Sequence, residues 1–137
     1  MKRVLFLCTG NSCRSQMAEA IINARLVGEW QAVSAGTKPA GYVHPKALEV
    51  LSEIGIQHSG HSKLVDEFRG DDFDLVVTVC DSAAEECPVW IGKGKREHHS
   101  FPDPAKAEGT DDEVMNVFRT VRDEIDEAMI SLLQARS

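Results

Sequence analysis

Residues 4–26, VLFLCTGNSCRSQMAEAIINARL, join a short apolar run, a polar loop and an amphipathic segment. The apolar run at residues 4–7 is bounded by a turn, which is typical of a buried parallel strand. A helical pattern begins around Ser15 and carries apolar side chains at Met17, Ala18, Ile21, Ile22 and Leu26. The stretch therefore predicts a strand, a tight loop and a helix.

The rest of the chain continues this alternation of strands and helices. Further strands are predicted at residues 31–34, at 74–79 and near 97–101, and further helices after Pro45, at residues 64–68 and from Asp111 onward. The segment FPDPA at residues 101–105 contains two prolines and predicts an irregular turn. The pattern predicts one α/β domain over residues 1–137, an open four-stranded parallel sheet with helices on both faces. Ligands of such sheets bind beyond the carboxyl ends of the strands.

Composition narrows the class of protein. The chain has 137 residues, 42% of them hydrophobic and 27% charged, which is a normal balance for one globular domain. Its formal charge of -7, without a cluster of Lys and Arg, argues against nucleic acid as a partner. No apolar run approaches the roughly 20 residues of a membrane span, and the apolar start is too short for a signal peptide. We expect a cytoplasmic, monomeric protein that binds no membrane.

The loop after the first strand has the composition of an oxyanion site. Its backbone N–H groups lead into a helix N-terminus, and Gly10 and Asn11 tolerate positive φ. Arg14 adds a planar guanidinium that can hold two oxygens of an oxyanion. The same donors and positive potential would stabilise the thiolate form of Cys8 at the base of the loop. Ser15 can donate to that sulfur or cap the helix. The predicted oxyanion-binding residues are Thr9, Gly10, Asn11, Ser12, Cys13 and Arg14.

Four cysteines, Cys8, Cys13, Cys80 and Cys87, admit more than one interpretation. In a reducing cytoplasm they are catalytic, redox-active, metal-binding or simply buried. Cys8 and Cys80 end two predicted strands and are expected to be neighbours at one edge of the sheet, whereas Cys13 is expected to be structural. A metal site is not predicted, because two cysteines with six residues between them, followed by adjacent histidines, is not a usual zinc spacing.

The pattern C-x5-R-S after the first strand resembles the signature loop of low-molecular-weight protein tyrosine phosphatases and of the arsenate reductases that share their fold. The stretch CTGNSCRSQMAEA looks like the reductase branch. Both groups use an aspartate of a D-P dipeptide as general acid, and Asp103-Pro104 is similar to that pair. Phosphatases typically place an aromatic residue after D-P, whereas Ala105 stands here.

The resemblance to the thioredoxin-coupled reductases extends to VTVCDSAAEECPVW at residues 77–90. It implies that Cys8 attacks arsenate, that Cys80 resolves the intermediate, and that Cys87 presents the disulfide to thioredoxin, in arsenic detoxification. Reduction of arsenate needs two electrons, which thiols supply by ending as a disulfide. Phosphate and sulfate are then competing oxyanions. Two alternatives stay open, a tyrosine phosphatase with a Cys8 phospho-enzyme and a non-catalytic oxyanion or metal sensor.

Some reductases of this kind bind a monovalent cation such as potassium beside the loop. The residues Asn11, Glu19, Ser34 and Ser62 match positions used there, but Leu64 replaces an acidic residue two places beyond the last. The resemblance implies no other cofactor.

Overall fold

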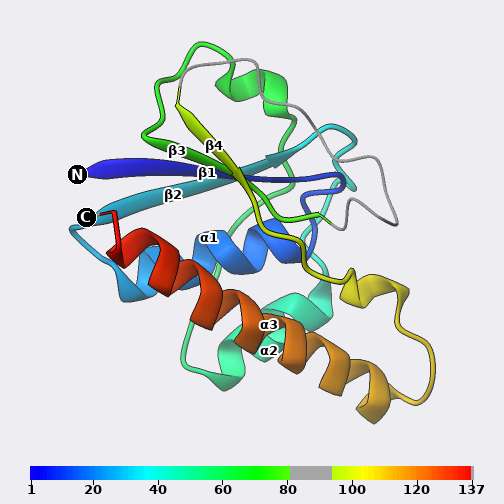
Figure 1. Ribbon diagram of the computed structural model, residues 1–137. Helices are drawn as coiled ribbons and strands as arrows, with labels where there is room; N and C mark the ends of the chain where they lie inside the picture. Colours follow the sequence, from blue (N-terminus) through cyan, green and yellow to red (C-terminus); the bar gives the residue numbers. More distant parts are fainter. Residues whose placement is uncertain (81–93, 137) are drawn as a thin grey trace.

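A computed structural model of the protein describes residues 1–80 and 94–136 (Figure 1). The elements follow in the order β1 (Lys2–Cys8), α1 (Arg14–Arg25), β2 (Trp30–Gly36), α2 (Pro45–Glu53), the 3₁₀ helix η1 (Val65–Phe68), β3 (Leu75–Thr78), β4 (Lys95–His98), the 3₁₀ helix η2 (Pro104–Lys106) and α3 (Asp111–Gln134). Within the described residues, four strands form one parallel sheet in the order β2-β1-β3-β4. The predicted α/β class and four-stranded parallel sheet are confirmed.

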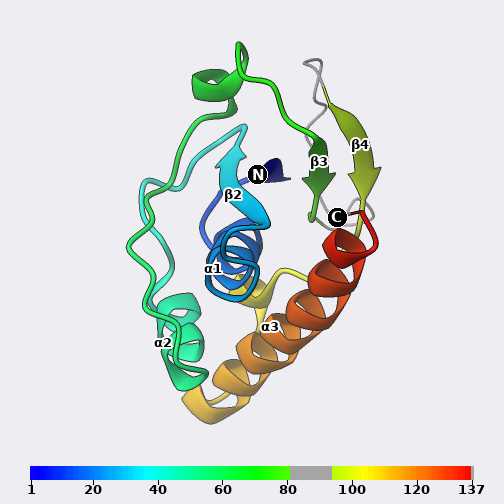
Figure 2. The same cartoon turned by 90° about the vertical axis from the view of Figure 1, so that its left-hand side faces the viewer.

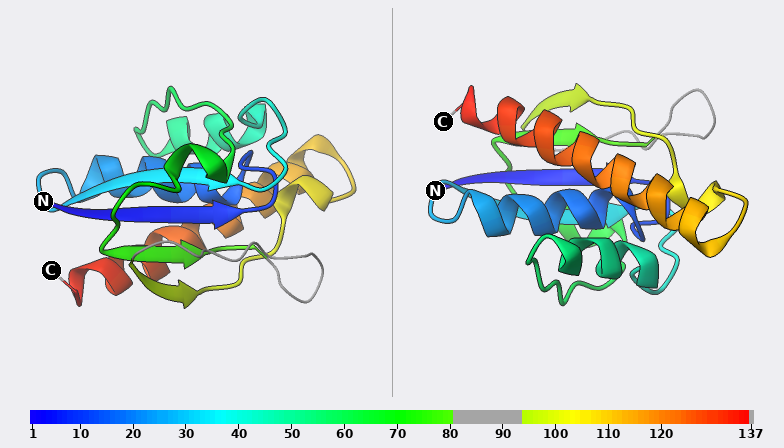
Figure 3. Two further views of the ribbon diagram at one scale, coloured as in Figure 1. Left: turned by 90° about the horizontal axis from the view of Figure 1, so that it is seen from above. Right: turned by 90° about the horizontal axis from the view of Figure 1, so that it is seen from below.

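The two faces of the sheet are covered differently (Figures 2 and 3). Helices α1, α2 and α3 lie against one face, where alternate β1 side chains such as Val4 and Phe6 join their apolar stripes in the main core. Leu5 and Leu7 point to the other face and pack with Val65 of η1. Because side chains of a strand alternate, the continuous apolar run of β1 reflects burial on both faces. Helices therefore lie on both sides of the sheet: α1, α2 and α3 on one side and the short 3₁₀ helix η1 on the other.

Local capping signals fix the ends of the helices that frame the loop. In α3, Thr110 accepts from the backbone N–H of Glu113, and the Glu113 side chain accepts from the Thr110 backbone, which is a capping box. In α2, His44 caps the first turn through Nδ1, which accepts from the Lys46 backbone at 3.1 Å. The His44 ring is thereby held where α2 begins, beside the pocket described below.

Two predicted boundaries were wrong. The last strand lies at Lys95–His98 rather than near residues 97–101, because it is an exposed edge strand whose limits follow its pairing with β3 and not an apolar pattern. Phe101 lies beyond it and is buried in the helix-side core. The segment predicted as irregular contains η2, because Pro104 stands in the first turn of a helix, where its missing N–H costs nothing.

The close approach of chain segments at the carboxyl edge of the sheet depends on Gly36, the last residue of β2. A Cβ at Gly36 would overlap the backbone carbonyl oxygens of Thr9 and Cys8. The loop after β1 can therefore pass over the end of β2 because this position has no side chain. In the described ranges 1–80 and 94–136, no helix combines the length and apolarity that crossing a membrane requires.

Candidate active site

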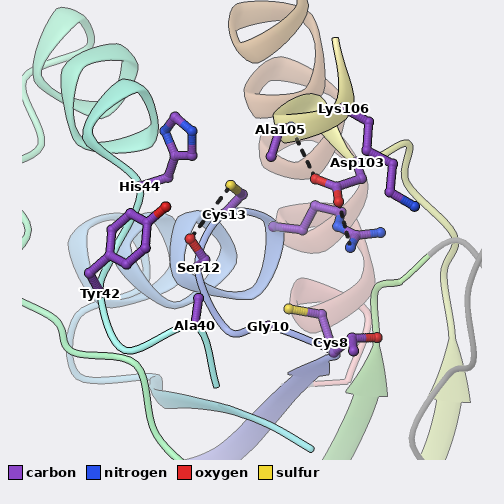
Figure 4. Close-up of a pocket in the computed structure, with 12 residues that line it drawn as sticks. Cys8, Gly10, Ser12, Cys13, Ala40, Tyr42, His44, Asp103, Ala105 and Lys106 are labelled. Atoms are coloured by element: carbon purple, nitrogen blue, oxygen red, sulfur yellow. Dashed lines mark hydrogen bonds and ion pairs between the residues drawn. The ribbon is translucent and has the colours of Figure 1, made fainter. Parts of the chain in front are cut away.

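The loop that follows β1 forms the floor of an open pocket of about 390 Å³ (Figure 4). From this loop the pocket is lined by Cys8, Thr9, Gly10, Ser12, Cys13 and Arg14. Cys8 is the last residue of β1 and Arg14 the first of α1, so strand end and helix start bracket the loop. All predicted oxyanion-binding residues except Asn11 line this pocket. A tetrahedral anion here would meet loop N–H groups, the helix dipole and the arginine.

The thiol of Cys8 is held by a short chain of buried hydrogen bonds. Its Sγ lies 2.9 Å from Ser15 Oγ, and Ser15 Oγ accepts from Asn11 Nδ2 at 2.8 Å. When Cys8 is a thiolate, its sulfur can only accept, so Ser15 then donates its hydroxyl hydrogen to it. Cys13, not Ser15, is the N-cap position of α1, so of the two predicted roles Ser15 adopts the contact with sulfur.

Asn11 braces the loop from behind instead of lining the pocket. It is fully buried and has a φ of 48°, a left-handed conformation that asparagine tolerates better than most residues. Its Oδ1 accepts from the Lys63 backbone at 2.8 Å and from Gln16 Nε2 at 2.9 Å. Gln16 Nε2 also faces the carbonyl oxygen of His61 at 2.9 Å. Segments distant in sequence therefore fix the curvature of the loop.

Ser15→Ala is expected to slow alkylation of Cys8 by iodoacetamide about tenfold near neutral pH, because the thiolate loses a hydrogen bond. Mass spectrometry of the Cys8 peptide measures this rate. Ser12→Ala is the matched control, since Ser12 Oγ faces Cys13 Sγ, at 4.0 Å, and should change the rate much less. Equal slowing in both variants would contradict a direct role of the Ser15 hydroxyl.

Arg14 is anchored so that its guanidinium borders the pocket. Nη1 donates to the Phe101 carbonyl at 3.2 Å, and Nη2 lies 3.7 Å from Asp103 Oδ2. The Arg14 side chain is 4% exposed and that of Asp103 is 21% exposed, so the carboxylate retains contact with solvent. The loop from Phe101 to Asp103 therefore connects the arginine to the opposite wall.

Asp103 lies on that opposite wall and faces the pocket (Figure 4). Its Oδ1 accepts from the Ala105 backbone N–H at 3.0 Å, which caps η2 and orients the carboxyl group. Its Oδ2 is on the side of Arg14. The structure thus brings Asp103, distant in the chain, to the same pocket as Cys8, and its role as general acid stays a prediction.

Cys13 and Cys80 differ in oxidation state: the first is a free thiol and the second is disulfide-bonded. Burial, and to a smaller extent the nearby Asp103 carboxylate, raises the pKa of the Cys13 thiol to about 12, so Cys13 is protonated at neutral pH. Cys13 lines the pocket all the same. Cys80 is fully buried and disulfide-bonded, whereas Cys8 and Cys13 are free. Leu7 pairs with Thr78, so Cys8, which ends β1, and Cys80, two residues beyond β3, lie at the same edge of the sheet. Cys87 lies outside the described residues.

The match to a family model decides the relationship of this chain to known proteins. Residues 3–136 match the model described as low molecular weight phosphotyrosine protein phosphatase. The chain belongs to this family. The cysteine, arginine and aspartate of the pocket all lie within the matched residues.

Individual relatives fall into two functional groups. The arsenate reductase of Halalkalibacterium halodurans is 50% identical over 125 residues, which cover 90% of this chain and 89% of that protein. A solved arsenate reductase in its phosphate-binding state has a TM-score of 0.80 and 33% identity, with both chains fully covered. The YwlE arginine phosphatase from Geobacillus stearothermophilus has a TM-score of 0.76 and 26% identity over 98% of this chain and 92% of that chain.

Three pocket residues were missed by sequence reasoning. Tyr42, His44 and Lys106 line the mouth of the phosphatase-like pocket (Figure 4). The His44 ring packs 4.9 Å from the ring of Phe118, and its pKa is lowered by burial and by the charge of Lys46. Lys106 follows the D-P dipeptide by two residues, which is a local signal that could have been used. Tyr42 and His44 carry no such signal, because packing of residues 40–44 against the loop places them there.

The four residues considered for a monovalent cation lie behind the signature loop. Glu19 and Ser34 contact each other directly, with Ser34 Oγ donating to Glu19 Oε1 at 2.9 Å. Ser62 Oγ donates to the Gly10 carbonyl at 3.0 Å, and Asn11 Oδ1 accepts the two hydrogen bonds described above. Leu64, which replaces an acidic residue of the resemblance, is exposed and contributes no charge. In the parts of the chain that the structure describes, no group of three or more His, Cys, Asp or Glu is placed to hold a metal ion.

Proposed function

We propose that this chain reduces arsenate to arsenite through a thiol–disulfide relay and takes its electrons from thioredoxin. The observation that carries the proposal is the pair of cysteines at one sheet edge: Cys8 free under an oxyanion pocket, and Cys80 buried and disulfide-bonded. A hydrolase of this fold needs one nucleophilic cysteine, whereas a two-electron reductase needs thiols that can end as a disulfide. The 50% identity to an arsenate reductase supports the same choice.

The first step uses residues of the pocket. The Cys8 thiolate attacks arsenic of an arsenate held by the loop N–H groups and Arg14, and one arsenate oxygen departs as water with a proton from Asp103. A Cys8–S–As(V) bond forms and an As–O bond breaks, with no change in oxidation state. The hydrogen bond from Ser15 that stabilises the thiolate is released as the sulfur becomes covalently bound.

The second step is the reduction. The Cys80 thiolate attacks Cys8 Sγ, a Cys8–Cys80 disulfide forms, and the electron pair of the S–As bond stays on arsenic, which leaves as arsenite, As(III). Cys87 then attacks Cys80 Sγ, so that Cys8 returns as a thiol and the disulfide moves to Cys80 and Cys87. A dithiol such as thioredoxin reduces that disulfide and restores the starting state. A free Cys8 and a disulfide-bonded Cys80 are the pattern expected after the attack by Cys87 and before thioredoxin acts.

Cys80→Ser tests the proposal. In an assay that follows NADPH oxidation with thioredoxin, thioredoxin reductase and arsenate, turnover by Cys80→Ser is expected to fall to the uncatalysed background. Hydrolysis of p-nitrophenyl phosphate by the same variant is the internal control and should persist at the wild-type level, because it does not require a second thiol. Cys87→Ser is expected to stop after one turnover. Multiple turnover of arsenate by both variants would refute the relay.

Phosphoester hydrolysis is the second candidate, favoured by the family and by a pocket that joins Cys8, Arg14 and Asp103. Its substrate would form a phospho-enzyme on Cys8 that water hydrolyses. Ala105 stands where phosphatases typically carry an aromatic residue, which gives an aryl ring little surface on that side. The same assay separates the candidate functions. Hydrolysis of p-nitrophenyl phosphate without arsenate turnover would favour the phosphatase. Oxyanion binding without hydrolysis and without arsenate turnover would favour a sensor.

A further inference from the structure

A buried ion pair lies behind the signature loop, on the side away from the pocket. Glu19 of α1 is 9% exposed and Lys63, which follows the loop of residues 57–62, is 8% exposed. Lys63 Nζ lies 3.6 Å from Glu19 Oε1 and donates to the His61 carbonyl at 2.9 Å. A carboxylate buried to this degree requires a positive partner, because its desolvation is otherwise very unfavourable.

His58 is the other group that could balance Glu19. Its Nε2 lies 3.7 Å from Glu19 Oε2 and 2.8 Å from Gln16 Oε1, to which it donates. Burial lowers the pKa of His58 and the charge of Lys63 lowers it further, while Glu19 acts in the opposite direction. The imidazole is therefore neutral at neutral pH, and Lys63 supplies the positive charge in contact with the carboxylate.

The same lysine connects this pair to the catalytic thiol. Its backbone N–H donates to Asn11 Oδ1, Asn11 Nδ2 donates to Ser15 Oγ, and Ser15 contacts Cys8 Sγ. Lys63 O also accepts from the Gly36 backbone at 2.9 Å, which joins the segment to the end of β2. A shift of Lys63 would therefore be transmitted to Asn11, whose left-handed backbone conformation shapes the oxyanion loop.

A monovalent cation does not fit among these residues. Such an ion would need several oxygen ligands. Glu19 and Ser34 offer oxygens here, while Asn11 Oδ1 already accepts two hydrogen bonds, so the place beside the Glu19 carboxylate decides whether an ion can bind. The ammonium group of Lys63 lies beside the one carboxylate of the group, at hydrogen-bond distance from the His61 carbonyl. A second cation within a few ångströms would be repelled by it.

We propose that the Lys63 ammonium group replaces a monovalent cation beside Glu19, so that Lys63 is a built-in positioning residue for the oxyanion loop and the protein needs no potassium. The proposal uses arsenate reduction as one readout, but thermal stability and Cys8 alkylation test it independently of that activity. A failure of arsenate turnover in the wild type would refute the proposed function and leave these two readouts intact.

The experiment compares potassium chloride with choline chloride at a constant ionic strength of about 0.1 M. For the wild type, the unfolding midpoint, the Cys8 alkylation rate and arsenate turnover are expected to be equal in the two salts. Lys63→Met, which leaves Glu19 buried without its partner, should unfold roughly 5 °C lower in choline and alkylate more slowly at Cys8. Potassium, small enough to enter the vacated space, should recover part of both losses.

Two further variants sharpen the test. Glu19→Gln/Lys63→Met removes both charges and is expected to regain stability relative to Lys63→Met and to lose the response to potassium. Arg25→Met breaks an exposed ion pair with Asp126, 3.0 Å long, at the far end of α1, and should respond equally to both salts. A saturable rise of the wild-type midpoint or alkylation rate in potassium would overturn the proposal, as would a Lys63→Met variant that potassium does not rescue. If Lys63→Met does not fold, the wild-type comparison and the double variant still decide.

Discussion

Cys8→Ser is expected to lower both arsenate turnover and p-nitrophenyl phosphate hydrolysis by at least about 10⁴-fold. The serine hydroxyl is almost the same size as the thiol and can keep the contact with Ser15 Oγ, so the fold and the oxyanion pocket should be retained. A hydroxyl does not ionise near neutral pH, however, and among the residues that the structure describes the side chain in hydrogen-bond contact with this position is Ser15, which is not a base. Steady-state rates measure the loss of activity, and calorimetry of phosphate binding measures whether the oxyanion pocket is retained.

Cys13 provides the matched control for this variant. It is also a buried, free cysteine of the same loop, and its pKa of about 12 keeps it protonated. Cys13→Ser is therefore expected to lose less than about tenfold in either activity, because the loop N–H groups remain in place. Comparable losses of activity in the two variants would rule out Cys8 as the nucleophile. So would a Cys8→Ser variant that hydrolyses p-nitrophenyl phosphate at a rate within tenfold of the wild type.

Arg14→Lys is expected to lower kcat/KM by about 10²–10³-fold while preserving the charge. The guanidinium is planar and can hold two oxyanion oxygens, while its Nη1 and Nη2 also connect to Phe101 and Asp103. A lysine ammonium offers a single point charge and cannot maintain these contacts together. The loss should appear in kcat and in the affinity for phosphate as a competing oxyanion, which inhibition kinetics with both substrates would measure.

Arg122 is a buried arginine away from the pocket and serves as the control for Arg14→Lys. Its Nη1 donates to the Val50 carbonyl at 2.9 Å and contacts Glu53 at 3.0 Å, which joins α3 to α2. Arg122→Lys is expected to lower the unfolding midpoint by a few degrees and to leave kcat/KM of the folded enzyme unchanged. A similar fall of kcat/KM in both variants would show that Arg14 contributes through packing alone.

The order of secondary-structure elements could be predicted from the sequence wherever the pattern that indicates an element lies within the element itself. The strand, loop and helix of residues 2–25 follow from an apolar run, a glycine and asparagine, and helical periodicity, all within one short stretch. The edge strand β4 could not be delimited, because its polar residues carry no alternation and its pairing with Leu75–Thr78 sets its limits. Cys8, Arg14 and Asp103 were predicted as site residues because their side chains are chemically distinctive, and the structure brings them to one pocket.

The sequence by itself was enough to predict the oxyanion loop, since Cys8, the backbone donors and Arg14 are within seven consecutive positions. It also indicated Cys80 as a partner through the rule that parallel strands end at a common edge. Only the tertiary structure decided what shapes the loop. Asn11 receives its hydrogen bond from Lys63, 52 residues away, and Glu19 receives its charge partner from the same residue. Such pairs depend on the packing of separate segments, and no periodicity or local spacing in the chain records them.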